Sequence, residues 1–297
     1  MKKSALLMLA VILAACEREA PPDVAVPPVV IYAYGDESQG LAERFAGFTA
    51  ATGTPIQVVH GDSKELTDTV IANRGTPKAD VLLTSNAADI IRAADEGALR
   101  PIQSAAVDDV RAEGRDSDKL WVAFESYGAV VGAAERMETR IVSYTGLARP
   151  DIGKEVCLSS SRLPINRAVI ARLIEDKGLK PAERIVRGWV RNQKLVPFAT
   201  EAELIAALGD GTCGYGIFSA DLEAPGVRIS DPFPSYYNIR ALGVARHAQN
   251  PGSAQALVEW IIVNIPLEIP EEKGKSAGRI GWMDEDVRLL AERAGYR

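Results

Sequence analysis

A run of three serines is the stretch of this chain whose residue types and position point most directly to ligand chemistry. Residues 159–161 are all serine; they follow the apolar run 156–158 and precede apolar residues at helical spacing. This order predicts a strand, a polar turn and a helix capped by one of the serines. The free N–H groups at such a helix start can bind a phosphonate or carboxylate, with Arg162 beside them. Capping of the helix alone is the simpler interpretation of any one serine.

The histidines give no support to a catalytic site. His60 and His247 are the only two, and neither belongs to a Ser/His/Asp or metal-ligand pattern. The sequence also has no phosphate loop and no Gly-x-Ser-x-Gly motif. We therefore expect neither enzyme activity nor a cofactor.

The N-terminus predicts export. Lys2 and Lys3 precede an apolar stretch at residues 5–15, which is typical of a secretory signal peptide and too short to span a membrane. Cys16 follows Leu-Ala-Ala, which resembles a bacterial lipobox, so residues 1–15 would be a lipoprotein signal and Cys16 the lipid anchor. An ordinary signal peptide with an incidental cysteine is the alternative. Residues 16–28, rich in proline and acids, would form a flexible tether.

Two further cysteines, Cys157 and Cys213, lie in short apolar segments. In an oxidising compartment such a pair indicates a disulfide, and two buried thiols are the competing interpretation. No third ligand accompanies them, so we expect no zinc site.

Composition limits the remaining classes of protein. The chain has 297 residues, of which 47% are hydrophobic, and this size favours two lobes over one. Its formal net charge is −6 and it has no long basic run, which argues against binding to nucleic acid or to an anionic membrane surface.

Alternating apolar segments predict two α/β lobes, each with a mainly parallel sheet flanked by helices. We assign residues 29–124 and 239–297 to lobe 1 and residues 125–238 to lobe 2. The expected strands are 29–34, 56–59, 79–84, 120–124, 128–133, 156–158, one near Val196, 215–219 and 239–245. The expected helices are one through Leu41, Phe45 and Phe48 that stops at Thr52-Gly53, and those at 65–73, 87–97, 166–177, 182–191, 201–208, 254–263 and 287–294.

Several motifs resemble one family of proteins. They are FTAATG at 48–53, KADVLLT at 78–84, DEGALRPI at 95–102, residues 153–160 with Asn166, residues 238–244 and LLAERAGY at 289–296. Together they resemble the extracellular solute-binding proteins of ABC importers, and specifically the ferric-iron-binding group with its two-lobed type II fold.

The resemblance implies a monomer that closes on a small-molecule ligand and delivers it to an ABC-type or other membrane permease. Two segments, near 124–127 and 235–238, would cross between the lobes. Ligand contacts from both lobes would favour the closed form, which the permease would recognise. The protein would reside in the periplasm, held to a membrane by its lipid anchor.

The iron ligands of that group are absent from the matching positions. Glu37 stands where a histidine would be, Ser85 where a carboxylate would be, and Asp221-Leu222 where two tyrosines would be. The arginine-bearing segment of the first crossing reads Tyr127-Gly128-Ala129, so a bound anion also loses a partner. We therefore expect no metal at these positions.

The exchanged residues favour a largely apolar ligand with a polar head, such as a lipid-like or sterol-like molecule, or another organic solute. A ferric site rebuilt from tyrosines and carboxylates, and an organic anion or phosphonate, are the alternatives. Glu125 and Tyr127 lie two apart and so on one face of an extended segment, where they would meet a polar group. The candidate ligand-binding residues are Tyr34, Ser85, Glu125, Tyr127, Ser160, Ser161, Asn166, Asp221, Tyr236, Tyr237 and Asn238.

Overall fold

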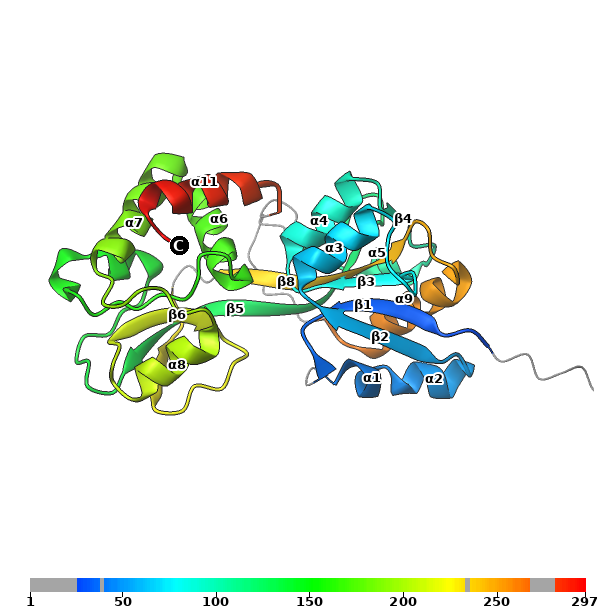
Figure 1. Cartoon of the computed structure of the whole chain (residues 1–297), viewed down its shortest axis with the longest axis horizontal. Helices are drawn as coiled ribbons and strands as arrows, with labels where there is room; N and C mark the ends of the chain where they lie inside the picture. The colour runs from blue at the N-terminus through cyan, green and yellow to red at the C-terminus, as the bar shows by residue number, and fades with distance from the viewer. Residues whose placement is uncertain (1–25, 38–39, 233–235, 268–280) are drawn as a thin grey trace, which may run out of the picture.

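Two long strands run from one half of the molecule to the other. The computed structural model describes residues 26–37, 40–232, 236–267 and 281–297 (Figure 1). Strands β5 (Val122–Ala134) and β8 (Tyr237–Ala245) extend between two groups of helices and strands. The predicted signal peptide, Cys16 and most of the tether lie outside the described residues.

The first lobe is built on buried parallel strands. Strands β1 (Val29–Tyr34) and β2 (Ile56–Gly61) pair in parallel along their whole length, and β1 also pairs in parallel with β3 (Val81–Thr84). Every residue of β1 and β3 is buried, which explains their unbroken apolar sequences. The carboxyl ends of these strands therefore meet at one edge, facing the second lobe (Figure 1).

Side-chain caps begin the helices that follow β2 and β3. Asp62 accepts a hydrogen bond from the N–H of Glu65 at the start of α3 (Ser63–Ile71), and Asn86 accepts one from Asp89 at the start of α4 (Ala87–Asp95). These caps fix where each chain turns at the strand ends.

The crossing strand β5 is longer than the sequence predicts. Residues Glu125, Ser126 and Tyr127 interrupt the apolar pattern, which suggests two short runs, but the backbone continues through them paired antiparallel with β8. An irregularity in register between Ala123 and Glu125 is the only trace of the interruption within this pairing. The main path of paired strands is β2-β1-β3-β8-β5-β6, where β6 spans Tyr215–Ser219.

The sheet of the second lobe corrects one detail of the predicted fold. Strands β6 (Tyr215–Ser219) and β7 (Val227–Ser230) both pair antiparallel with β5, so the named strands here are not parallel. Val156 makes only isolated parallel bridges, to Gln193 and Tyr215, instead of forming a full strand. The strand expected near Val196 is also wrong, because the segment makes only isolated bridges, at Gln193 and Phe198, and Val196 itself is 83% exposed.

The C-terminal helix is a second correction. Helix α11 (Asp284–Ala294) packs on α6 (Pro164–Lys177) and α7 (Leu179–Arg191), and its apolar residues belong to the core of the second lobe. The assignment of all residues 239–297 to lobe 1 is therefore wrong at its end. An amphipathic helix does not by itself show which lobe covers its apolar face.

The remaining elements surround these sheets, and no helix within the described ranges is both long and apolar enough to cross a membrane. They are α1 (Leu41–Arg44), α2 (Ala46–Thr52), β4 (Leu99–Arg100), α5 (Ala106–Asp109), η2 (Ala112–Gly114), η3 (Tyr144–Ala148), η4 (Pro150–Ile152), α8 (Glu201–Gly209) and α9 (Pro251–Asn264).

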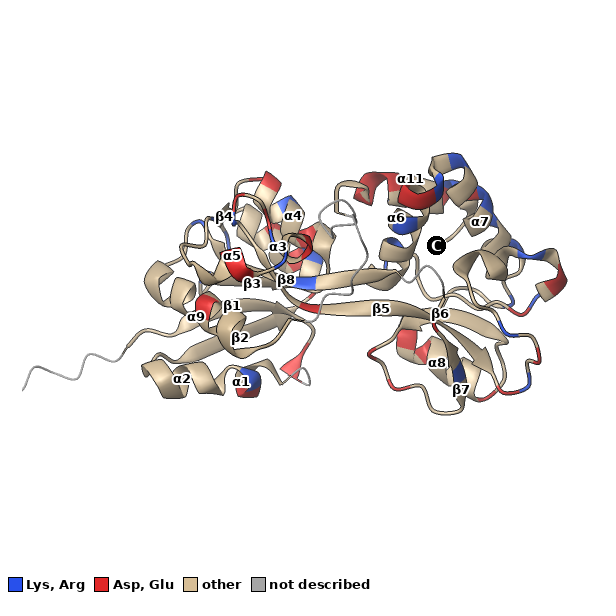
Figure 2. Ribbon diagram, turned by 180° about the vertical axis from the view of Figure 1, so that it is seen from behind, with Lys and Arg blue, Asp and Glu red and all other residues tan. Residues whose placement is uncertain are grey.

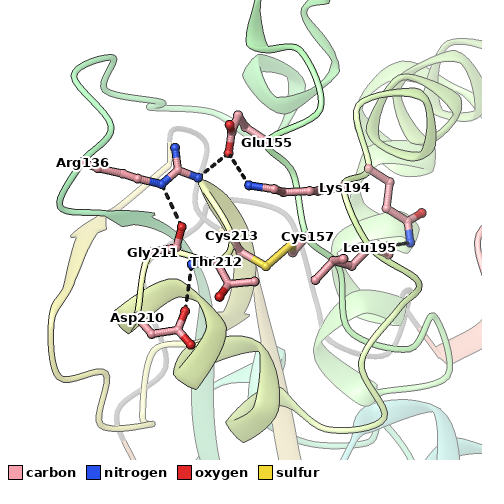
Figure 3. Close-up of a disulfide and its surroundings, with 10 residues drawn as sticks. Arg136, Glu155, Cys157, Lys194, Leu195, Asp210, Gly211, Thr212 and Cys213 are labelled. Atoms are coloured by element: carbon pink, nitrogen blue, oxygen red, sulfur yellow. Dashed lines mark hydrogen bonds and ion pairs between the residues drawn. A yellow bond between two sulfur atoms is a disulfide. The ribbon is translucent and has the colours of Figure 1, made fainter.

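A disulfide joins Cys157 to Cys213 in the second lobe, with both residues fully buried (Figure 3). Figure 3 shows Arg136 and Lys194 reaching Glu155, two residues before Cys157. The disulfide thus ties the segment before the three serines to the segment before β6.

Candidate ligand-binding site

Four charged side chains meet where the strands pass between the lobes. Glu125 of β5 and Arg240 of β8 are paired residues in the sheet, and Arg240 Nη1 donates to Glu125 Oε2 at 3.0 Å. Arg240 Nη2 donates to Asp221 Oδ2 at 2.7 Å, and Arg44 also pairs with Glu125. We call Arg44, Glu125, Asp221 and Arg240 the Arg240 cluster. Figure 2 shows charges of both signs on the crossing strands.

The cluster connects the two lobes. Arg44 ends α1 in the first lobe, Asp221 lies in the turn after β6 in the second, and the other two residues are on the crossing strands. The side chains of all four are between 19% and 37% exposed, so water and small solutes reach them. Each ion pair is therefore partly desolvated, which strengthens it relative to a surface pair.

Two tyrosine rings lie beneath the Arg240 guanidinium. Its central carbon is 4.6 Å from the ring centroid of Tyr127 and 5.4 Å from that of Tyr34, distances that allow cation–π attraction. Burial would lower the pKa of Arg240, but Tyr34 and the bonded Asp221 more than reverse this effect, and the net pKa is raised. The guanidinium therefore stays charged at every physiological pH.

The two phenols differ in what they bind. Tyr127 Oη donates to the carbonyl oxygen of Ser85 at 2.9 Å, whereas Tyr34 Oη has no hydrogen-bond partner among the described residues. Burial raises the pKa of Tyr34 to about 12 and raises that of Tyr127 as well, so both are neutral phenols at pH 7. All four charges of the Arg240 cluster influence the pKa of Tyr34, and its ring lies 5.4 Å from the guanidinium carbon of Arg240, so Tyr34 belongs to the site.

Glu201 is a further carboxylate next to the cluster. It begins α8, and its carboxylate accepts hydrogen bonds from the N–H of Ser219 at 2.6 Å and from the Ser219 hydroxyl at 3.2 Å. These bonds hold the end of β6, two residues before Asp221. Burial raises the pKa of Glu201, and the nearby Asp221 adds to this effect.

The raised pKa of Glu201 predicts a pH dependence of stability. Because the folded protein holds this proton more tightly than the unfolded chain, its stability falls as pH rises from the ordinary glutamate pKa through the raised one. We expect Glu201→Gln to remove this part of the slope, as measured by urea unfolding between pH 4 and 8. The exposed Glu96→Gln variant is the control, and an unchanged slope in Glu201→Gln would contradict the assignment.

Asn238 links both lobes from the crossing strand β8. Its Oδ1 accepts a hydrogen bond from the N–H of Ala87 at the start of α4 (3.1 Å), and its Nδ2 donates to the carbonyl of Pro164 at the start of α6 (3.3 Å). A small pocket of ≈10 Å³ beside it is lined from both lobes, by Arg167 and Asn86 among others. That volume is enough for one water molecule.

Removing the Asn238 side chain is expected to lower stability. Asn238→Ala leaves the buried N–H of Ala87 without its side-chain acceptor and removes the link to Pro164, which costs roughly 1–3 kcal/mol of unfolding free energy. Chemical denaturation measures the change. Asn264→Ala, at an exposed site on α9, is the matched control and should stay within about 0.5 kcal/mol of the wild type. Equal small effects in both variants would show that the bridge is not formed.

The structure brings five of the predicted binding residues together and places others elsewhere. Glu125 and Asp221 are members of the Arg240 cluster, and the rings of Tyr34 and Tyr127 lie beside the Arg240 guanidinium. Ser85 is linked to them through its carbonyl, which accepts the hydrogen bond from Tyr127. Tyr236 is buried in the second lobe, where it stacks on Tyr144, and Tyr237 is buried beneath Arg172, so neither ring lines the site. A buried tyrosine ring at a lobe boundary is the simpler interpretation of both residues.

The serine run is satisfied internally. The N–H of Ser160 donates to Phe198 O and that of Ser161 to Arg297 O, while Asn166 Nδ2 donates to Ser159 Oγ at 2.8 Å. Helix α6 begins at Pro164 with Leu163 as its N-cap and no side-chain cap, so the predicted serine cap is wrong. Proline suits the first position of a helix, so the helix begins at Pro164, three residues after the last serine of the run.

The signature positions of iron binding do not converge on a metal site. Glu37 is exposed, Leu222 is 38% exposed, and Asp221 is paired with Arg240. Within the described ranges, no group of three or more His, Cys, Asp or Glu residues could hold a metal ion. A guanidinium in the middle of the site also disfavours a bare trivalent cation.

Arg44, Arg240 and Glu201 were not predicted as site residues. Arg240 is the single charge in the apolar run 239–245, and a charge inside a buried strand requires a partner. That signal was present in the sequence. Arg44 and Glu201 do not interrupt an apolar run, so the sequence does not single them out. Each lies on a short helix, and only the tertiary structure brings that helix close to β5.

Two α/β lobes joined by crossing strands, with polar residues gathered at the crossing, define a type II periplasmic solute-binding protein. The chain belongs to the family of bacterial extracellular solute-binding proteins, since the model of that family matches residues 29–264. The fold class and the family resemblance predicted from sequence are thus confirmed. Proteins of this family bind solutes outside the cytoplasm.

Several of the relatives and solved structures that match have names that refer to iron uptake or ferric binding. The chain is 24% identical over 241 residues to iron uptake protein A1 of Synechocystis sp., covering 74% of this chain and 67% of that protein. It is 22% identical over 252 residues to the Fe(3+)-binding periplasmic protein of Serratia marcescens, covering 78% and 73%.

Solved structures share the fold at similarly low identity. A Trichodesmium protein in complex with iron and citrate ligands superposes with a TM-score of 0.78 at 22% identity, over 91% of this chain and all of that chain. The apo ferric ion-binding protein A of Pasteurella haemolytica gives 0.79 at 20% identity, over 91% and 98%.

Proposed function

We propose that this protein binds a small organic anion between its lobes, at the Arg240 cluster, and delivers it to a membrane permease. The observation that carries the proposal is the convergence of two guanidinium groups, Arg44 and Arg240, on Glu125, with the Tyr34 ring 5.4 Å from the guanidinium carbon of Arg240. Guanidinium groups bind carboxylates with paired hydrogen bonds, and Arg44 has donors left over after its contact with Glu125. Contacts from both lobes would favour closure around the anion.

A ferric ion bound as a chelate of such an anion is the second candidate. The names of two relatives refer to iron uptake or ferric binding, and one similar structure contains iron with citrate. Tyr34, Glu125 and Asp221 supply oxygen atoms that suit a hard cation, while the arginines suit its carboxylate partner. This candidate differs from the bare ferric ion, for which the usual donors are missing.

The lipid-like ligand favoured by the sequence finds no support here. The exchange of iron ligands for Ser85, Leu222 and small residues suggests an apolar site, but four partly exposed charges stand at the crossing. Burying an apolar body against them would strip their water without replacing it.

We further propose that Cys16 carries the lipid that holds the periplasmic protein to a membrane, with residues 16–28 as the tether and a monomer as the working form. Support comes from the Leu-Ala-Ala-Cys order and from the solute-binding family, whose members act outside the cytoplasm. Replacing Cys16 with serine should release the protein from the membrane fraction. Retention of that variant would argue against the anchor.

A thermal-shift screen tests the proposed ligand class. The full chain carrying Cys16→Ser is mixed with citrate, ferric citrate, ferric ion alone, a phosphonate and a hydroxylated lipid. A ligand present at 100 times its Kd stabilises the folded state by about 2.7 kcal/mol, which raises the Tm by roughly 5 °C for a chain of this size. We expect a carboxylate, free or chelating iron, to produce the shift, and Arg44→Gln to reduce it.

Arg288→Gln is the matched control because Arg288 is an exposed residue that pairs only with neighbours on α11. A shift produced by the lipid alone, or one that survives Arg44→Gln unchanged, would contradict the proposal.

A further inference from the structure

The Arg240 cluster has equal numbers of opposite charges. Arg44 and Arg240 are positive, Glu125 and Asp221 are negative, and every one is paired with another member of the cluster. A ligand that takes the atoms used in these pairs must therefore exchange with pairs that already exist. The need to replace both the positive and the negative partners therefore limits which charges the ligand can carry.

A ligand with charge of only one sign leaves part of the cluster unpaired. A simple anion that takes the bonded donors of the arginines displaces Glu125 or Asp221, and a simple cation that takes the carboxylates displaces the arginines. In either case, a partly desolvated charge loses its partner, which opposes binding. A ligand carrying both signs replaces each internal pair with a new pair and leaves none unpaired.

The charges are also arranged in a direction. The positive end, Arg44, belongs to the first lobe, and the negative end, Asp221, belongs to the second, where Glu201 lies close enough to interact electrostatically with it. Arg240 lies between the two ends, since it bonds both Glu125 and Asp221, and the Tyr34 ring lies 5.4 Å from its guanidinium carbon. The faces of Tyr34 and Tyr127, now beneath a guanidinium, can equally attract an ammonium group.

Resting on the proposed function, we infer that the ligand is a zwitterion of the amino-acid type, with its carboxylate toward Arg44 of the first lobe and its ammonium toward Asp221 of the second. Such a ligand links opposite charges on the two lobes, so its binding favours closure. Tyr34 Oη donates to the carboxylate, and the tyrosine faces accept the ammonium.

Matched triplets of compounds test the inference. Each of the twenty L-amino acids is compared with its deaminated acid and its decarboxylated amine; for valine these are isovalerate and isobutylamine. Binding to the full chain carrying Cys16→Ser is measured by calorimetry at pH 7. We expect at least one amino acid to bind at least tenfold more tightly than both of its matched compounds.

Two variants separate the ends of the ligand. Asp221→Asn should abolish the preference for the amino acid over its deaminated acid, whereas Arg44→Gln should weaken both and preserve the preference. Asp151→Asn and Arg288→Gln, at exposed positions, are the matched controls and should change neither affinity.

The outcomes distinguish this inference from the proposed function. If deaminated acids bind as tightly as amino acids, or if only ferric citrate binds, the anion site stands and the zwitterion is ruled out. If no amino acid, carboxylate or ferric chelate binds, both are overturned. An amino-acid preference that persists in Asp221→Asn would contradict the assigned orientation.

Discussion

Replacing Arg240 with methionine is expected to weaken ligand binding roughly a hundredfold. The variant leaves two carboxylates without their partly buried partner, which lowers the binding free energy by about 3 kcal/mol. The side chain is 19% exposed and bonds Glu125 of the crossing and Asp221 of the second lobe. Without it, two carboxylates face the same site and repel both each other and any anionic group. Methionine keeps much of the apolar volume, so the change removes mainly charge and hydrogen bonds.

Calorimetry with the ligand that gives the largest thermal shift measures this loss. Arg288→Met, at an exposed arginine, is the matched control, and far-UV circular dichroism checks that both variants fold. A second variant, in which Arg240→Met is combined with Asp221→Leu, should recover stability but not binding. Wild-type affinity in Arg240→Met would remove the Arg240 cluster from the site.

Removing the disulfide is expected to have the second large effect, a loss of stability. Replacing Cys157 and Cys213 with alanine is expected to lower the unfolding free energy by about 4 kcal/mol, because the bond closes a loop between residues 56 apart and restricts the unfolded chain. Urea unfolding measures the difference. Dithiothreitol should lower the wild type by a similar amount and leave the double variant unchanged.

A loss below about 1 kcal/mol, or an equal response of both proteins to dithiothreitol, would contradict a disulfide that stabilises the second lobe.

Much of the fold follows from local sequence pattern. Strands β1 and β6 begin and end where their apolar runs do, because each is buried along its whole length. The prediction failed where tertiary contacts decide the structure. Helix α6 began at Pro164 without a serine cap, the segment around Val196 formed no strand, and β7 occurs where no strand was expected.

The site was less predictable than the fold. Tyr34, Glu125 and Tyr127 were found because they lie at strand ends or on a crossing segment. Their function depends on charges brought together from positions far apart: Arg44 and Glu125 are separated by 81 residues. A periodic pattern carries no information about such pairs, so the chemical class of the ligand inferred from sequence, a mainly apolar molecule, does not fit the charges that surround the site.

The central claim is that a solute binds at the Arg240 cluster and touches both lobes. A crystal structure of the protein with the ligand that stabilises it most tests this claim directly. We expect ligand density within hydrogen-bond distance of Arg44, Arg240 and Tyr34, with the second lobe contributing Asp221. Density bound elsewhere, with the four ion-paired residues still bonded to one another, would contradict it.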